Sequence, residues 1–257
     1  MDTSSHGGRR PRVLTPRRVV SVAELATYLD KRLYSPDIDE QGVREGCHQA
    51  VRQGVATAVT RPEHLRAASA VLRGTGVGLV TALGWHGCDD DRLTVDAVQA
   101  EAEELVGLGA TEVAYVVSSA RIAPDGGREV ADHLARLVDT LAPHGARARA
   151  ILDTDEMTED EVSRMCREVA EAGVWMVQGG SWRGRRAGLS QLEDIRAALP
   201  SEVLVKWTEP VRSVSSLLLS ISMGIERFNG DVDQLLGDAE RAQWLAPLTI
   251  PVAGVDY

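Results

Sequence analysis

Lysine is nearly absent from this sequence. Lysine and arginine together number 28, and only Lys31 and Lys206 are lysines, which leaves 26 arginines. Because arginine supplies positive charge almost everywhere, a lysine kept inside the apolar segment "SEVLVKWTEP" (201–210) indicates a need that arginine cannot meet. Loss of the proton, or attack of the amine on a carbonyl, are two such needs.

Other shortages exclude classes of protein. Three scattered cysteines, Cys47, Cys88 and Cys166, give neither a disulfide framework nor a zinc spacing, so we expect reduced thiols in a cytoplasmic protein. A net charge of −10 and a pI of about 5.1 argue against a nucleic-acid partner. No apolar run approaches the ~20 residues of a membrane span, and the polar, arginine-rich opening lacks the apolar core of a signal peptide. We expect no membrane partner, no metal and no cofactor.

Short apolar segments alternate with amphipathic ones along the chain. The predicted strands are 25–30, 55–60, 78–83, 112–117, 147–153, 174–178, 203–207 and 225–229. The predicted helices are 39–54, 61–74, 94–109, 127–145, 158–173, 189–200 and 211–224. Eight strands alternating with helices over about 250 residues predict an α/β fold, a single-domain (β/α)8 TIM barrel. An open doubly wound sheet is less favoured, because no glycine-rich turn follows the first strand.

The expected division of the chain is a disordered leader (1–22), a barrel (23–243) and a C-terminal tail (244–257). In such barrels, functional side chains lie where strands end. Lys206 lies near the end of the seventh predicted strand, where burial would lower the pKa of its ammonium and favour the nucleophilic amine. The alternative is a structural ion pair with Glu209 or Asp153.

Aromatic residues are few but fall near predicted strand ends. Trp85, Trp182 and Trp207 would shape a pocket for a carbonyl-bearing or ring-bearing small molecule, with Tyr115 on the fourth predicted strand, although each could instead pack in the core. His86 could act as a general acid or base, or be a plain loop residue.

A basic loop follows the sixth predicted strand. Arg183, Arg185 and Arg186 in "GGSWRGRRAG" could grip a carboxylate or phosphate, or simply be solvated.

Four segments, in order and spacing, resemble those of one known family. They are "YLDKRLYSPDID", "TAVTRPEHLRAASAVLRGTGVGLVTALGW", "ILDTDEMTEDEVSRMCREVAEAGV" and "VLVKWTEPVRS". From about Ala23 to about Arg241 the chain resembles the deoxyribose-phosphate aldolases, which are Schiff-base enzymes on a (β/α)8 barrel. The resemblance implies a lyase of aldolase type and a homodimer.

The chain departs from that family at two catalytic positions. Gln178, in "MVQGGSW", stands where the family has its imine-forming lysine, and a glutamine cannot form a Schiff base. Ala114 stands where the family has an aspartate that shuttles protons. Lys206 is retained, and in the family that lysine tunes its neighbour and helps to move protons.

Charged residues at Asp30, Arg149 and Asp153 resemble the family's interior positions. Since buried charges need partners, we expect a network that joins Asp153, Arg149 and Lys206. The last residue, Tyr257, matches a terminal tyrosine that enters the site in some aldolases of the family, although a frayed end is equally expected of a terminus.

The family's phosphate-binding turns are also replaced. Glu209 and Pro210 follow the seventh strand, and Asp231 and Asp233 follow the eighth. Carboxylates repel an anion, and proline removes a donor N–H, so a sugar phosphate held in the family's manner is disfavoured.

Three hypotheses follow. The first is an aldolase-like enzyme of a specialised-metabolite pathway that makes or breaks a carbon–carbon bond next to a carbonyl. It would use Lys206 as imine former or acid/base, with Asp153 and Tyr257 as further catalytic groups. The second is a non-covalent cyclase, isomerase or lyase in which Gln178 binds the substrate and Lys206 polarises it. The third is a non-catalytic binding protein.

Overall fold

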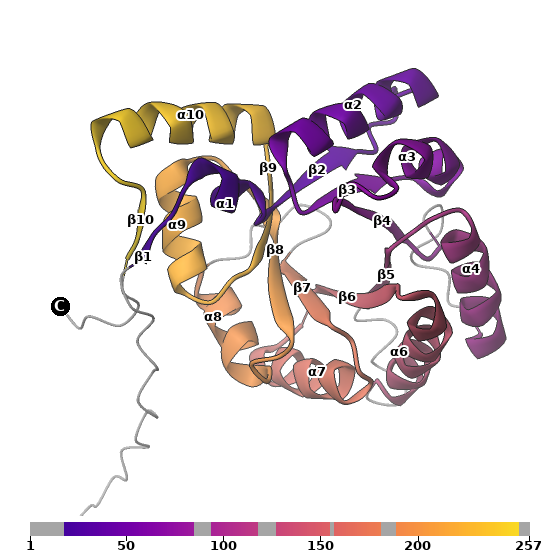
Figure 1. Cartoon of the computed structure of the whole chain (residues 1–257). Coiled ribbons are helices and arrows are strands. Elements are labelled where there is room, and N and C mark those ends of the chain that lie inside the picture. The colour runs from indigo at the N-terminus through magenta and orange to yellow at the C-terminus, as the bar shows by residue number, and fades with distance from the viewer. Residues whose placement is uncertain (1–17, 85–93, 118–126, 155–156, 181–188, 252–257) are drawn as a thin grey trace, which may run out of the picture.

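In the part of the chain that the structure describes, eight parallel strands close into a barrel (Figure 1). The computed structural model describes residues 18–84, 94–117, 127–154, 157–180 and 189–251, with no side-chain description for Asp153 and Leu189. The strands are β2 (Leu29–Leu33), β3 (Thr57–Thr60), β4 (Gly78–Ala82), β5 (Glu112–Val117), β6 (Arg147–Asp153), β7 (Met176–Gly180), β8 (Leu204–Val211) and β9 (Arg227–Gly230). β2 pairs with both β3 and β9, which closes the barrel and confirms the predicted (β/α)8 fold.

Helices surround the barrel on all sides (Figure 1). They are α1 (Val22–Ala26), α2 (Glu40–Gln53), α3 (Leu65–Leu72), α4 (Val95–Gly107), α6 (Arg128–Leu141), α7 (Glu159–Glu171), α8 (Leu189–Ala198), α9 (Val214–Ser222) and α10 (Val232–Leu245), with short 3-10 turns at Pro62–His64 and Ala142–His144. Many begin at a short polar side chain that accepts a hydrogen bond from a free backbone N–H of the first turn. These N-cap residues are Ser21, Asp39, Thr94, Thr158, Ser213 and Asp231. None of the described helices has the length and apolar content to cross a membrane.

The first predicted strand, 25–30, is wrong in its position. Residues Val22–Ala26 form a helix, because Ser21 and Glu24 make a reciprocal capping box at its start. The strand begins at Leu29 and ends at Leu33, three residues beyond the predicted end.

The other boundaries differ by a few residues at most. β5 and β6 have the predicted bounds, whereas β8 continues to Val211 through a register shift between Trp207 and Pro210. The sequence did not predict α10. It also did not predict a two-stranded antiparallel sheet, in which β1 (Arg18–Val19), inside the expected leader, pairs with β10 (Thr249–Ile250), inside the expected tail. The exact domain bounds remain predictions.

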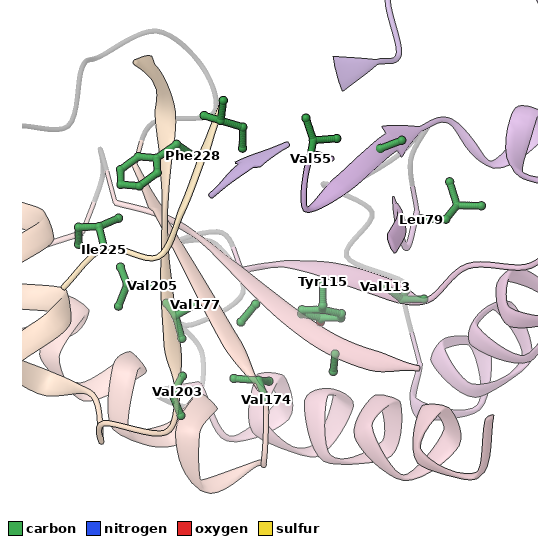
Figure 2. Close-up of a cluster of buried hydrophobic side chains, with 14 of the residues drawn as sticks. Val55, Leu79, Val113, Tyr115, Val174, Val177, Val203, Val205, Ile225 and Phe228 are labelled. Atoms are coloured by element: carbon green, nitrogen blue, oxygen red, sulfur yellow. The ribbon is translucent and has the colours of Figure 1, made fainter. Parts of the chain in front are cut away.

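Side chains of each barrel strand alternate between two environments. On β5, Val113, Tyr115 and Val117 belong to the main apolar core between the barrel and its helices, part of which Figure 2 shows. Ala114 and Val116 belong to a separate small cluster inside the barrel. Because successive residues of a strand point to opposite faces, this alternation decides which side chains can reach a site in the barrel lumen. The described cysteines, Cys47 and Cys166, are buried free thiols.

Candidate active site

Lys206 projects from β8 into the barrel lumen. The residue is 2% exposed, and its Nζ donates a hydrogen bond of 2.5 Å to Oδ2 of Asp30 on β2. The partner that the structure gives Lys206 is thus an aspartate of the first barrel strand, which the sequence did not predict as its partner. β9 lies between β2 and β8 in the closed sheet, so the two side chains meet inside the barrel.

Asp30 is the hub of the interior charges. Besides Lys206, its carboxylate accepts hydrogen bonds from Nη1 of Arg227 at 2.9 Å, Nη1 of Arg149 at 3.3 Å and Oγ1 of Thr57 at 2.6 Å. The residue is fully buried. A carboxylate without solvent is stable only when it is paired in this way.

A second carboxylate completes the cluster. Glu112, the first residue of β5, accepts a hydrogen bond from Nη2 of Arg149 and lies 3.9 Å from Nη1 of Arg227. The cluster thus contains two arginines, two carboxylates and one lysine. The charges of the two arginines and the two carboxylates cancel. The cluster therefore has a net positive charge only when Lys206 is protonated.

The pKa values follow from this arrangement. Burial lowers the pKa of Lys206 to about 8, the carboxylate of Asp30 opposes the shift, and the positive charges of Arg149 and Arg227 add to it. Burial alone would raise the pKa of Asp30, but the charges of Lys206, Arg227 and Arg149 outweigh it and hold that pKa far below its usual value. Asp30 therefore stays ionised while Lys206 titrates near neutral pH.

Gln178 lies directly beside Lys206. The two residues are in register on β7 and β8, and Nε2 of Gln178 donates to Oγ1 of Thr208 at 3.1 Å. Gln178, Lys206 and Ala114 line one cavity of about 40 Å³ in the barrel, together with Arg149 and Asn229. The three positions at which the sequence was compared with the family's catalytic groups are therefore brought together around one small space.

The other lysine has a different environment. Lys31 directly follows Asp30 on β2, and its Nζ donates hydrogen bonds of 3.1 Å each to Gln53 of α2 and Asp233 of α10. These contacts lie between the barrel and its helices. Lys31 is thus accounted for by an ion pair, whereas Lys206 is the lysine of the lumen.

Two predicted substrate-binding residues lie on the wrong face. Tyr115 is 1% exposed in the core around the barrel (Figure 2). Its hydroxyl is 2.8 Å from Nδ1 of His133 on α6. Trp207 follows Lys206 on β8, points to the opposite face and packs against the same core. The prediction failed because adjacent residues of a strand cannot both face the lumen.

The remaining predictions have mixed outcomes. Arg149 lines the lumen cavity, and Glu209 is half-buried within the register shift of β8 but does not line that cavity. The other predicted residues lie outside the described residues, or, for Asp153, have no described side chain: Trp85, His86, Asp153, Trp182, Arg183 and Tyr257. Their roles stay predictions.

Glu112 and Arg227 were not among the residues predicted for the site. Glu112 lies two residues before Ala114 on β5, and Arg227 lies two residues before Asn229 on β9, so each shares a face with a residue of the lumen. A charged residue at the start of an apolar strand, in step with lumen positions, was the signal available for both.

Acidic residues occupy the start of α10, where the sequence predicted an altered phosphate site. The side chain of Asp231 caps the helix by accepting a hydrogen bond from the N–H of Gln234 at 3.0 Å. Asp233 pairs with Lys31 and also accepts a bond from Gln53. The cap uses a donor that an anion at this helix end would need.

Fold and site together define a (β/α)8 barrel of enzyme type with a buried amine in its lumen. No protein-family model matches the chain. It is 30% identical over 209 residues to the deoxyribose-phosphate aldolase of Methanothermobacter thermautotrophicus, covering 79% of this chain and 89% of that protein. It is 25% identical over 205 residues to that of Desulfitobacterium hafniense, covering 79% and 92%.

Solved structures give the same fold. A putative deoxyribose-phosphate aldolase from Coccidioides immitis superposes with a TM-score of 0.75 at 22% identity, covering 87% of this chain and 88% of the other. The deoxyribose phosphate aldolase of Aeropyrum pernix, described as tetrameric, has a TM-score of 0.73 at 21% identity and coverages of 88% and 94%.

The chain belongs to the deoxyribose-phosphate aldolase family. This confirms the resemblance found in the sequence and assigns the chain to the aldolase-type lyases that break carbon–carbon bonds on a (β/α)8 barrel.

Proposed function

We propose that this chain makes or breaks a carbon–carbon bond next to the carbonyl group of a small-molecule substrate, with Lys206 as the reacting amine. The observation that supports this is the position of Lys206: buried in the lumen, 2.5 Å from Asp30, beside Gln178, with its pKa lowered to about 8. An amine with such a pKa is partly neutral at physiological pH, and the neutral form is the nucleophile.

The proposed reaction begins with addition of the Lys206 amine to the substrate carbonyl carbon and loss of water, which gives a protonated imine. When the neighbouring carbon–carbon bond breaks, its electron pair moves toward the imine nitrogen, and a base takes the hydroxyl proton of the departing aldehyde. Asp153 and Tyr257 remain the proposed groups for this proton. Protonation of the carbon, then addition of water to the imine, release the second product and restore the amine.

Asp30 has a positioning role in this proposal. Its carboxylate is ionised and lies at the amine, so it can balance the positive charge of the imine as it balances the ammonium. Gln178 would hydrogen-bond the substrate beside the amine, because it lines the same cavity.

The substrate we propose has no phosphate at the start of α10. Asp231 caps that helix, and Asp233 lies in the same turn. Carboxylates at this position disfavour an anion. A carbonyl compound of a specialised-metabolite pathway, rather than a sugar phosphate held in the family's manner, is consistent with this charge.

Borohydride trapping tests the proposal. The protein is incubated with short aldehydes and ketones, with and without a phosphate group, and reduced with borohydride, and the adduct is located by mass spectrometry. We expect an adduct on Lys206 that is lost in Lys206→Met and kept in Lys31→Met. Lys31 is a matched control because it is the only other lysine of the chain and lies outside the lumen.

Two other outcomes would contradict the imine. Turnover without an adduct, abolished in Lys206→Met but retained in Lys206→Arg, would assign a non-covalent cyclase, isomerase or lyase in which the charge polarises the substrate. Activity that is unchanged in both variants would remove Lys206 from the chemistry and favour a binding role.

The assembly and location belong to the same proposal. The family resemblance supports a homodimer, and the relative from Aeropyrum pernix is described as tetrameric. Light scattering on the full chain distinguishes the two. A cytoplasmic location is supported by two described cysteines that are free thiols.

A further inference from the structure

A second cavity lies at the opposite end of the barrel from Gln178. Its volume is about 620 Å³, and it lies at the N-terminal ends of the strands, since it is lined by the first residues of β4, β5, β6 and β9. Those residues are Gly78, Glu112, Arg147 and Arg227. Nothing in the proposed carbon–carbon chemistry uses this end of the barrel.

The lining of this cavity has a surplus of positive charge. It contains Arg73, Arg147 and Arg227 but, among its residues, one carboxylate, Glu112, which is already bonded to Arg149. Within the described residues, neither Arg73 nor Arg147 pairs with a carboxylate. Because the whole chain has a net charge of −10, a local excess of arginine is the opposite of the general trend.

Trp175 holds two of these arginines together. The guanidinium carbon of Arg147 lies 4.6 Å from the centre of the Trp175 ring, and that of Arg227 lies 5.8 Å from it. Cation–π contact fixes both side chains at one wall of the cavity. Two like charges beside one ring repel each other, and an anion between them would relieve that repulsion.

Buried donors without partners lie at the same wall. Nε of Arg227 and Nε1 of Trp175 have no hydrogen-bond partner among the described residues, although both atoms are shielded from solvent. Arg227 is 8% exposed. A buried donor that lacks a partner costs free energy, so an acceptor bound in this cavity would be stabilising.

The rim of the cavity is open. Gly74, Gly76 and Gly145 lie along it, each with a positive φ, and a β-carbon at any of them would meet no atom within 4 Å. A rim of bare backbone leaves room for a ligand to enter beside Arg73 and Arg147.

We propose that this cavity binds a small dianionic oxyanion, of the sulfate, phosphate or dicarboxylate class, through Arg73, Arg147 and Arg227, and that its occupancy is linked to Lys206. The link is structural: Nη1 of Arg227 bonds to Oδ1 of Asp30, and Oδ2 of the same carboxylate bonds to Lys206. An anion next to Arg227 adds negative charge to these linked ion pairs, and this charge favours the ammonium form of Lys206. Linkage is reciprocal, so protonation of Lys206 must strengthen anion binding by the same factor.

Calorimetric titration of the full chain with sulfate tests the site, because sulfate keeps its charge across the pH range used. We expect saturable binding at pH 7. The affinity should weaken by about tenfold or more in Arg147→Gln and in Arg73→Gln, because each variant loses a charge-assisted hydrogen bond to the anion. Arg44→Gln is the matched control: Arg44 is a surface arginine near the start of α2 that pairs with Glu40. The same titration with malonate tests whether a dicarboxylate binds at the site.

The pH dependence of sulfate affinity tests the link to Lys206. Sulfate affinity should fall between pH 7 and pH 9 in the wild-type protein, and this fall should be smaller in Lys206→Met. If neither anion binds saturably, or if Arg147→Gln binds as the wild type does, the site is refuted. If the pH dependence is the same in Lys206→Met, the link is refuted. These readouts need no carbonyl substrate, so their failure is distinct from failure of the imine chemistry.

Discussion

At the scale of single residues, the two lysines show how the environment decides the role of one side chain. Lys31 and Lys206 each have a carboxylate partner, at 3.1 Å and 2.5 Å. The partner of Lys31, Asp233, is 66% exposed, whereas Asp30 is fully buried. An exposed partner is screened by water, but two buried arginines act on Lys206 with little screening. The lowered pKa of Lys206 therefore couples its proton to the fold.

The pKa of Lys206 predicts how stability depends on pH. Its pKa of about 8 in the folded protein is lower than the ordinary lysine pKa of 10.5. Between these values the unfolded chain holds one more proton than the folded protein, so raising the pH through this window stabilises the fold. We expect the free energy of unfolding of the wild type, relative to Lys206→Met, to be constant below pH 8 and to rise above it.

Urea unfolding of both proteins at several pH values between 6 and about 10 measures this difference, and subtracting the variant removes the titrations that the two proteins share. A difference that stays flat across the window would mean that Lys206 is not held as a perturbed amine.

At the scale of secondary-structure elements, the alternation along each strand is the information in the sequence that separates lumen residues from core residues. Ala114 lines the lumen cavity, and alternation along β5 then places Tyr115 on the helix side and Glu112 in the lumen. The same reasoning from Lys206 places Trp207 outside. The strand positions themselves were largely predictable, because apolar segments bounded by glycine and polar residues are a strong local signal.

What the sequence could not predict is the identity of the hub. Asp30 and Lys206 are 176 residues apart, and they meet only because closure of the barrel through β9 brings β2 near β8. The register shift after Trp207 was equally hidden. Both depend on long-range pairing of strands, for which no local pattern exists.

The cap of α10 provides a prediction at this scale. Asp231→Ala removes the side-chain acceptor of the Gln234 N–H, and we expect the free energy of unfolding to fall by about 1 kcal/mol. Asp231→Asn keeps an acceptor at the same position and should cost only a fraction of that amount. Equilibrium unfolding in urea compares the two variants. Equal losses in both would show that charge at the helix start, and not the capping bond, is responsible.

At the scale of the whole molecule, both ends of the described chain meet. β1 and β10 pair beside α9, and the chain after α10 returns to reach them (Figure 1). Val20, Leu248 and Ile250 are buried at this junction, each at 4% exposure or less. The small sheet therefore adds apolar contacts to the main core rather than lying free on the surface.

Removal of one of these side chains tests that contribution. Ile250→Ala should lower the free energy of unfolding by about 2–4 kcal/mol, as truncation of a buried isoleucine does elsewhere. Val19→Ala, on the paired strand but 64% exposed, is the control and should change it by less than about 0.5 kcal/mol. Thermal and chemical unfolding measure both. Near-equal effects would mean that the junction opens independently of the barrel.

The ion pairs of the lumen also form a continuous row, from Arg227 at the N-terminal end of the strands, through Asp30, to Lys206 beside Gln178. Because Asp30 stays ionised while Lys206 gains or loses its proton, the barrel interior has two charge states that differ by a single proton. Uptake of that proton therefore changes the electrostatic potential at both ends of the barrel at once.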